Sequence, residues 1–140
     1  APDKKVVAAI HAGWRGTVKQ IVAKTVEYMI ARYGCDPSLM LAGIAPSLCK
    51  ESFEVGDEVA EAFRATGVDM NRIMERNART GKAHIDLWEA NRMQLLQSGL
   101  QPERIEVSGI CTYQHPDDFF SARRLGIKSG RILSGIMIKD

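Results

Sequence analysis

The hexapeptide at residues 11–16, HAGWRG, brings a metal-capable imidazole, an indole, a guanidinium and two glycines together in one short stretch. It follows the apolar run KVVAAI, and α/β proteins place their ligands at the carboxyl ends of such strands. The glycines allow a tight backbone turn into a helix, whose N-terminus, with Arg15 beside it, can hold an anion. His11 is then either a ligand-binding residue or a hydrogen-bonded structural one. Spacing alone favours the structural role, because a lone histidine is weak evidence of function.

A second stretch that could carry chemistry spans residues 43–56, GIAPSLCKESFEVG, where an expected strand runs into Pro46, Ser47 and Cys49 before a helix. A thiol near the start of a helix can have a lowered pKa and act as a nucleophile or a metal ligand. Nucleophilic cysteines are activated by a partner base, and none is adjacent to Cys49 in the sequence. The sequence therefore favours an inert cysteine in a tight turn.

A third stretch, CTYQHPDDFFSARR at residues 111–124, also follows an expected strand. Cys111 and His115 are four positions apart, which suits a pair of zinc ligands in a loop. Arg123 and Arg124 can receive an anionic group through parallel hydrogen bonds. Alternatively, the two phenylalanines of this stretch pin a loop to the core while the arginines face solvent.

Ligand-type side chains recur along the chain, so a Cys/His zinc site would form if folding brought three or four of them together. The candidates are His11, Cys49, His84, Cys111 and His115. Their spacing does not decide whether they meet.

The composition indicates a globular protein. Of the 140 residues, 45% are hydrophobic and 26% are charged, and a chain of this length forms one domain that buries about 68% of its unfolded surface. No apolar stretch approaches the roughly 18 residues that span a bilayer, so we expect a cytoplasmic protein with no membrane partner. A net charge of +2 provides no basic face for nucleic acid. Three cysteines without a CxxC pair indicate reduced thiols.

Hydrophobic periodicity and turn residues predict an alternation of strands and helices. Strands are expected over residues 6–10, 39–45, 105–111 and 132–138, and helices over residues 17–33, 53–63 and, after the N-cap Asp86, up to Gly99. Residues 70–82 are expected to form a short helix and a surface loop. The order β-α-β-α-α-β-β favours an α/β fold, a mixed β-sheet layered with helices, with its site at strand ends.

Four segments carry a resemblance to a known family. They are HAGWRG, APSLCKESFEVGDEV, HIDLWEANRMQLLQSGL and CTYQHPDDFFSARR. Their order and spacing resemble those of the YfiH family, also called the laccase-domain or multicopper polyphenol oxidase family. Its members are described as purine nucleoside phosphorylases. The resemblance runs from about Val6 to the last expected strand. It implies that residues 1–140 are a single domain, the C-terminal part of a YfiH-like laccase domain, with an incomplete version of the family fold.

The resemblance also implies a metal site of which this chain holds one ligand. The family's zinc, or copper in the older interpretation, is held by two histidines and one cysteine, and the histidine of HAGWRG corresponds to His11. The other histidine lies in a VHG motif and the cysteine in a TADC motif. Both motifs precede HAGWRG in the family, and neither occurs here. This disfavours a zinc site built from Cys49, Cys111 and His115, whose roles stay open.

The family's activity implies a reaction and its substrates. Phosphorolysis splits adenosine, inosine and S-methyl-5'-thioadenosine with phosphate into the base and ribose 1-phosphate, so the expected partners are purine nucleosides and phosphate. His11 is the expected catalytic and metal-binding residue. Arg15, Arg123 and Arg124 are the candidates for substrate binding, because guanidinium forks fit phosphate and stay charged. An adenosine deaminase activity is also implied, since zinc lowers the pKa of a bound water toward neutrality.

Two other functions stay open. The first is a copper-dependent polyphenol oxidase of the laccase type; His2Cys sites do bind copper, but one copper is poorly suited to passing four electrons to oxygen. The second is a catalytically inactive fragment or interaction module, because His11 alone should bind zinc weakly. Missing strands would leave a sheet edge and an apolar face uncovered. The family's N-terminal portion and a second copy of this chain are therefore the expected partners of such a module.

Overall fold

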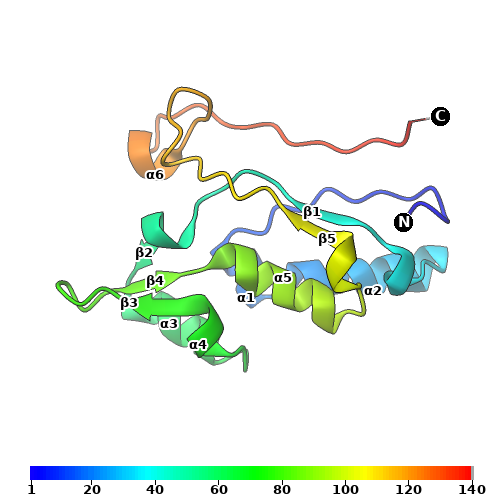
Figure 1. The fold of residues 1–140 in the computed structure, drawn as a ribbon, viewed down its shortest axis with the longest axis horizontal. Coiled ribbons are helices and arrows are strands. Elements are labelled where there is room, and N and C mark those ends of the chain that lie inside the picture. The colour runs from blue at the N-terminus through cyan, green and yellow to red at the C-terminus, as the bar shows by residue number, and fades with distance from the viewer. Residues whose placement is uncertain (140) are drawn as a thin grey trace. The chain divides into compact units, whose positions relative to one another are not determined.

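The computed structural model describes residues 1–139, which fall into two compact units. The first contains Ala1–Ile44, Ala90–Val107 and the residues from Ser134 onward, and the second contains Ala45–Glu89 and Ser108–Leu133. Figure 1 traces the chain from the blue N-terminus to the red C-terminus through the labelled elements. Each unit has buried apolar side chains of its own.

Helices and one parallel pair of strands make up the first unit. Its elements are α1 (Trp14–Val18), α2 (Ile21–Tyr33), β1 (Ala42–Ile44), most of α5 (Leu87–Gln97) and β5 (Ile105–Val107), with 3-10 turns at Pro37–Leu39 and Pro102–Arg104. The strands run parallel, with Ala42 opposite Ile105 and Ile44 opposite Val107. Parallel strands require a long crossover connection, which here includes the whole middle of the chain.

The helix predicted over residues 17–33 is confirmed for α2 but is interrupted near its start. Gln20 has a φ of 58°, a left-handed conformation that separates α1 from α2. The apolar periodicity continues across this break, which is why the sequence pattern predicts a single helix. At its other end α2 stops at Gly34, whose φ is 64° and whose N–H bonds to the Ile30 carbonyl. This is the glycine cap that the sequence predicts.

The buried face of α2 forms the core of the first unit. Val22, Val26 and Met29 are spaced by four and three residues, so they lie on one side of the helix. The other buried members of this core are Cys35, Met40, Leu95 and Leu100. None of the helices within residues 1–139 combines the length and apolar composition needed to cross a bilayer.

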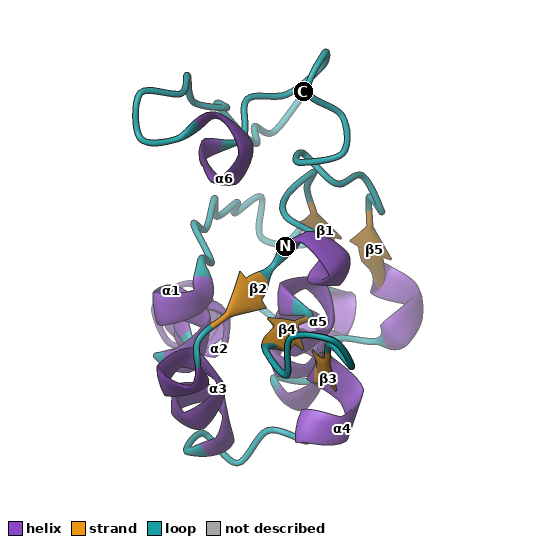
Figure 2. Cartoon of the chain, turned by 90° about the vertical axis from the view of Figure 1, so that its left-hand side faces the viewer, coloured by secondary structure: helices purple, strands orange, loops and turns teal. Residues whose placement is uncertain are grey.

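The second unit is built on a three-stranded antiparallel sheet in the order β2–β4–β3. Its elements are a 3-10 turn at Lys50–Ser52, β2 (Glu54–Val55), α3 (Asp57–Arg64), α4 (Met70–Ile73), β3 (Met74–Arg76), β4 (Ala83–Ile85) and α6 (Ala122–Leu125). Figure 2 shows the short strands in orange and the helices in purple. Phe63 of α3, Ile73 of α4 and Ile85 of β4 are almost completely buried.

Two predictions in the second unit are wrong in part. The helix expected over residues 53–63 begins only at Asp57, because Glu54 and Val55 pair with β4 instead. Within residues 70–82 the short helix is confirmed as α4, but β3 follows it and also pairs with β4. Over so few residues an apolar pattern fits a helix and a strand equally well. Pairing with a neighbouring strand, here β4, decides between the two. Asp86 caps α5 as predicted, since its Oδ1 accepts the Glu89 N–H at 2.9 Å.

The apolar segments at residues 6–10 and 132–138 are not strands, contrary to prediction. Within residues 1–139 neither segment pairs with a neighbouring strand, and a strand is stabilised by its ladder rather than by its composition. Leu133 and Met137 are 97% and 81% exposed. The other two predicted strands exist in shorter form as β1 and β5. The mixed α/β class is therefore confirmed, with a parallel pair and an antiparallel sheet.

Replacing Phe63 with alanine should lower the free energy of unfolding by about 3–5 kcal/mol, because a large side chain that is 1% exposed leaves a cavity. Chemical denaturation monitored by circular dichroism measures the change. Phe120, which is 55% exposed, provides the matched control, and Phe120→Ala should cost far less. Equal losses in the two variants would contradict a core centred on Phe63.

Candidate functional site

His11 lies on the surface immediately before α1. The hexapeptide forms the predicted turn into a helix, with Gly13 as the N-cap and Trp14 as the first helical residue. The imidazole is exposed and makes no hydrogen bond within residues 1–139. The hydrogen-bonded histidine that spacing favours is therefore not observed, and both ring nitrogens of His11 remain open to a ligand.

The two glycines of the hexapeptide lie close to His11 and do not adopt an unusual backbone conformation. Neither has a positive φ. A Cβ added at Gly13 would lie 3.3 Å from His11 Nε2, and one at Gly16 would lie 3.3 Å from the His11 carbonyl oxygen. Both distances are tighter than ordinary van der Waals contact, so the ring and the backbone of His11 occupy space that a larger residue would need.

Thr17 fixes the backbone of the hexapeptide from inside the first unit. It is 1% exposed, and its hydroxyl lies 3.2 Å from the Ala12 carbonyl, 3.1 Å from the Gly13 carbonyl and 3.2 Å from Asn91 Oδ1. Gln94 Nε2 donates to the Thr17 carbonyl at 2.7 Å. Helix α5 thereby holds the start of α1 in place. Thr17 was not among the predicted site residues, although a threonine at the head of an otherwise apolar helical face is a signal for a buried polar contact.

Arg15 is stacked on its neighbour. Its guanidinium carbon lies 4.4 Å from the centre of the Trp14 ring, within the range of a cation–π interaction. Trp14 is half-buried and Arg15 is exposed. The indole therefore restrains the guanidinium at the surface while leaving its N–H groups accessible.

The structure brings the two cysteine-containing stretches together in the second unit. Ser47 and Cys111 form a parallel bridge, in which the Ser47 N–H donates to the Ile110 carbonyl at 3.2 Å and the Thr112 N–H donates to the Ser47 carbonyl at 3.0 Å. Trp88 Nε1 donates to Ser47 Oγ at 2.6 Å and anchors the turn. Cys49, two residues further on, then places its N–H 3.3 Å from Cys111 Sγ.

The two thiols differ in acidity because hydrogen bonds converge on one of them. Burial raises the pKa of the Cys49 thiol, and its hydrogen bond with Cys111 raises it further, to about 11. Burial also pushes the pKa of Cys111 upward, but hydrogen bonds from the thiol and the N–H of Cys49 outweigh it. Together with Ser52 they lower the pKa of Cys111 to about 7. Cys111 is therefore the thiol that ionises first. The inert cysteine that the sequence predicts in this turn fits Cys49, whose pKa is raised, but not Cys111.

Arg123 and Arg124 are exposed but tethered. Arg123 donates to the Glu54 carbonyl at 2.9 Å and lies 5.3 Å from the centre of the Phe53 ring. Arg124 donates to the Tyr113 carbonyl at 3.1 Å and lies 5.3 Å from the centre of that residue's ring. Each guanidinium thus donates from one nitrogen to a backbone carbonyl, and the N–H groups of its other nitrogens remain available as donors.

The loop before these arginines is pinned less firmly than expected. Phe119 is half-buried, whereas Phe120 is 55% exposed. The alternative in which both phenylalanines pin the loop is therefore wrong for Phe120, whereas the arginines are exposed as that alternative supposes.

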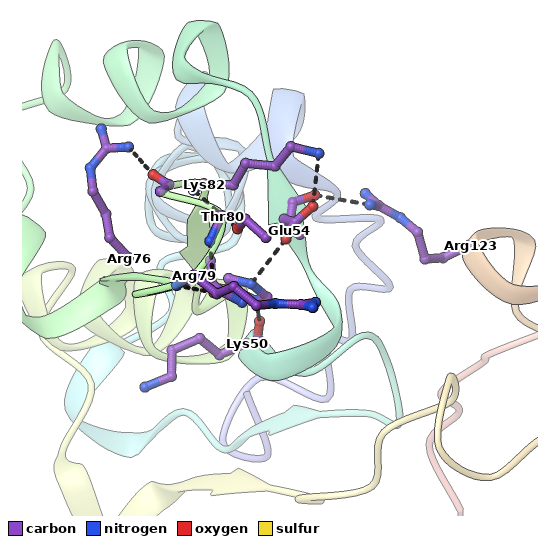
Figure 3. A network of polar contacts seen from close by, with 10 residues as sticks. Lys50, Glu54, Arg76, Arg79, Thr80, Lys82 and Arg123 are labelled. Atoms are coloured by element: carbon purple, nitrogen blue, oxygen red, sulfur yellow. Dashed lines mark hydrogen bonds and ion pairs between the residues drawn. The ribbon is translucent and has the colours of Figure 1, made fainter.

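His84 lies beside a network of charged side chains that no local sequence pattern indicated. Its Nε2 lies 3.5 Å from Glu54 Oε2, and its Nδ1 donates to the Lys50 carbonyl at 3.1 Å. Lys82 donates to Glu54 Oε1 at 3.0 Å, which holds the pKa of that carboxyl below its usual range. Figure 3 shows Lys82 and Arg123 each joined to Glu54 by a dashed line. Glu54 and His84 meet because they are paired residues of β2 and β4, a register that no local pattern reveals.

A shallow hollow of about 210 Å³ adjoins this network. It is lined by Lys50, Glu51, Glu75, Arg76, Asn77 and His84. Cationic and anionic side chains balance around it, and Lys50 pairs with Glu75 at 3.1 Å. The hollow therefore has no evident preference for an anion such as phosphate.

The Cys/His zinc site that the sequence left open is not found. Within residues 1–139 no three histidine, cysteine, aspartate or glutamate side chains are placed to hold one metal ion. Cys49 and Cys111 do meet, but His84 faces a carboxylate and His115 is exposed in a turn. Antiparallel pairing of β2 with β4 decides the position of His84.

The chain belongs to the family described as multi-copper polyphenol oxidoreductase laccase, which it matches over residues 1–139. This confirms the resemblance carried by the four sequence segments. The crystal structure of YfiH from Bacillus licheniformis has the same fold, with a TM-score of 0.75 at 32% identity over 83% of this chain and 44% of that chain.

Curated relatives carry the names of enzymes. A purine nucleoside phosphorylase from Bacteroides thetaiotaomicron is 59% identical over 138 residues, covering 97% of this chain and 51% of that protein. The adenosine deaminase RL5, from an unknown prokaryotic organism, is 48% identical over 134 residues, covering 96% of this chain and 51% of that protein. The chain thus spans about half the length of the curated relatives it matches.

Thr17→Val should lower the free energy of unfolding by about 1–3 kcal/mol, because it removes a buried hydroxyl that links α1 to α5. Urea denaturation measures the loss. Thr25→Val makes the same change at a hydroxyl that bonds only to the Ile21 carbonyl on the exposed side of α2, and it should stay within about 0.5 kcal/mol of the parent. A comparable loss in both variants would show that the Thr17 contacts do not anchor the hexapeptide.

Proposed function

We propose that this chain forms part of a purine nucleoside phosphorylase, in which phosphate splits adenosine, inosine or S-methyl-5'-thioadenosine into the base and ribose 1-phosphate. The observation that carries the proposal is the 59% identity to the Bacteroides thetaiotaomicron protein of that name over 97% of this chain. The relative named adenosine deaminase supports deamination of adenosine as a second activity of the same protein.

In this proposal His11 is a zinc ligand, with copper as the alternative metal. Its exposed imidazole has no competing hydrogen bond within residues 1–139, so it suits a metal. The residues described here supply no complete ligand set, and catalytic zinc normally takes three protein ligands. Two further donors are therefore required, which the family resemblance assigns to the VHG and TADC motifs. A bound zinc ion would supply Lewis acidity and an activated water.

Arg15 in the first unit, and Arg123 and Arg124 in the second, are separate candidates to receive the phosphate. Arg15 is exposed over Trp14, and Arg123 and Arg124 each use one nitrogen on a backbone carbonyl. A guanidinium has five N–H donors, so each of the three keeps donors for phosphate oxygens. Tethering also reduces the side-chain freedom that would be lost when an anion binds.

A chimera that joins this chain to the unmatched part of the Bacteroides thetaiotaomicron relative tests the proposal. With inosine and phosphate it should release hypoxanthine and ribose 1-phosphate, and this chain alone should release little. His11→Ala in the chimera should lower the rate roughly 100-fold or more, since even residues that only support a metal ligand cost 10–100-fold. His115→Ala, at another exposed histidine, should leave the rate unchanged.

Other outcomes of the same assay favour other functions. Oxidation of a phenol by the copper-loaded chimera, without phosphorolysis, would support the polyphenol oxidase. A folded chimera that performs neither reaction would support an interaction module. An unchanged rate in the His11 variant would remove His11 from the site.

In the active chimera, Arg15→Ala should raise the KM for phosphate about tenfold or more, because a hydrogen bond to a charged group is typically worth about 1.5–3 kcal/mol. Steady-state rates at varied phosphate concentration and saturating inosine measure it. Arg64→Ala serves as the control, since Arg64 pairs with Glu61 on α3. If the KM for inosine rises instead while that for phosphate stays constant, Arg15 does not receive phosphate.

A further inference from the structure

Cys49 and Cys111 are separated by 62 positions in the sequence but are neighbours in the second unit. The Cys49 N–H donates to Cys111 Sγ at 3.3 Å, and this nitrogen is two covalent bonds from the Cβ that carries the Cys49 thiol. Ser52 Oγ lies 3.4 Å from Cys49 Sγ and 3.6 Å from Cys111 Sγ. The two thiols also interact with each other. Both cysteines are free, and only cysteines that are close neighbours can form a disulfide.

The surroundings give the two sulfurs different roles. Cys111 receives hydrogen bonds from Cys49 and ionises first, so it is the better nucleophile. Cys49 stays protonated next to it and also accepts a hydrogen bond from Gln114 Nε2 at 3.5 Å. A thiolate beside a second thiol is the arrangement in which oxidation by a peroxide ends in a disulfide rather than in higher oxidation states.

We propose that Cys49 and Cys111 form a reversible intramolecular disulfide when the protein meets hydrogen peroxide. The Cys111 thiolate attacks one peroxide oxygen, the O–O bond breaks, and hydroxide leaves after taking up a proton as water. The resulting sulfenic acid is attacked by the Cys49 sulfur, the S–S bond forms, and a second water leaves. Two thiols are oxidised and one peroxide is reduced to two waters. A dithiol reductant reverses the reaction.

Burial restricts which oxidants can react. Cys49 and Cys111 are 5% and 3% exposed, so a molecule as small as hydrogen peroxide can reach the sulfurs more easily than a bulky thiol reagent. Cys35 is equally buried at 3%, but its core cluster contains no second cysteine. It therefore controls for burial without a partner thiol. The inference does not depend on the proposed function.

Mass spectrometry of this chain after treatment with hydrogen peroxide, followed by alkylation under denaturing conditions, tests the proposal. We expect the mass to fall by two hydrogen atoms, a crosslinked peptide pair containing Cys49 and Cys111, and an alkylated Cys35. The disulfide should raise the Tm, because it closes a long loop. The parent chain gives this readout without any substitution.

Three variants then assign the roles. Cys49→Ser should stop at a sulfenic acid on Cys111 that dimedone traps, Cys111→Ser should form no disulfide, and Cys35→Ser should behave like the parent. The oxidation rate should be about tenfold lower at pH 6 than at pH 8, because the thiolate of Cys111 reacts and its pKa is about 7. Free thiols at both positions after peroxide treatment, or oxidation of Cys35 as fast as that of Cys111, would overturn the proposal.

Discussion

Parallel pairing between two distant segments joins the two strands of the first unit and brings Cys49 and Cys111 together in the second unit. In the first unit Ala42–Ile44 pair with Ile105–Val107, at an offset of 63 residues, and in the second unit Ser47 pairs with Cys111, at an offset of 64. The later segment thus contains one extra residue, and Gly109, with a φ of 66°, lies within it. A glycine accepts this conformation at little cost, as in a β-bulge. In the register of the second unit, the sulfur of Cys111 faces the backbone N–H of Cys49.

Close packing also constrains the backbone of the hexapeptide HAGWRG. The ring of His11 is exposed. The backbone beside it is held by other residues, and the ring itself takes no part in holding it. Gly13 and Gly16 leave space for its ring and carbonyl, while the buried hydroxyl of Thr17 and the amide of Gln94 secure the turn. The backbone beside His11 is therefore fixed, whereas within residues 1–139 its ring makes none of the hydrogen bonds that usually orient a metal-ligating histidine.

Charged side chains divide into those that are already neutralised and those that keep donors free. Glu54 and Lys82 pair with each other, as do Lys50 and Glu75, so this part of the second unit has little capacity for an anion. The candidate arginines pack instead on aromatic rings and backbone carbonyls, which restrain a guanidinium without neutralising it. The proposal for phosphate therefore rests on these arginines and not on the hollow beside His84.

The sequence by itself determined the family, the mixed α/β class, the body of α2 with its glycine stop, and the cap of α5 at Asp86. These features depend on local periodicity, on turn residues and on motifs, all of which can be recognised within a few consecutive positions. It also singled out His11, Cys49 and Cys111, but as separate possibilities. Only the tertiary structure decided that the apolar segments 6–10 and 132–138 find no strand partner within residues 1–139, that β2 and β3 replace helix and loop, and that the two cysteines meet. Each of these outcomes depends on which distant segment pairs with which, and strand pairing is a long-range choice that composition does not encode.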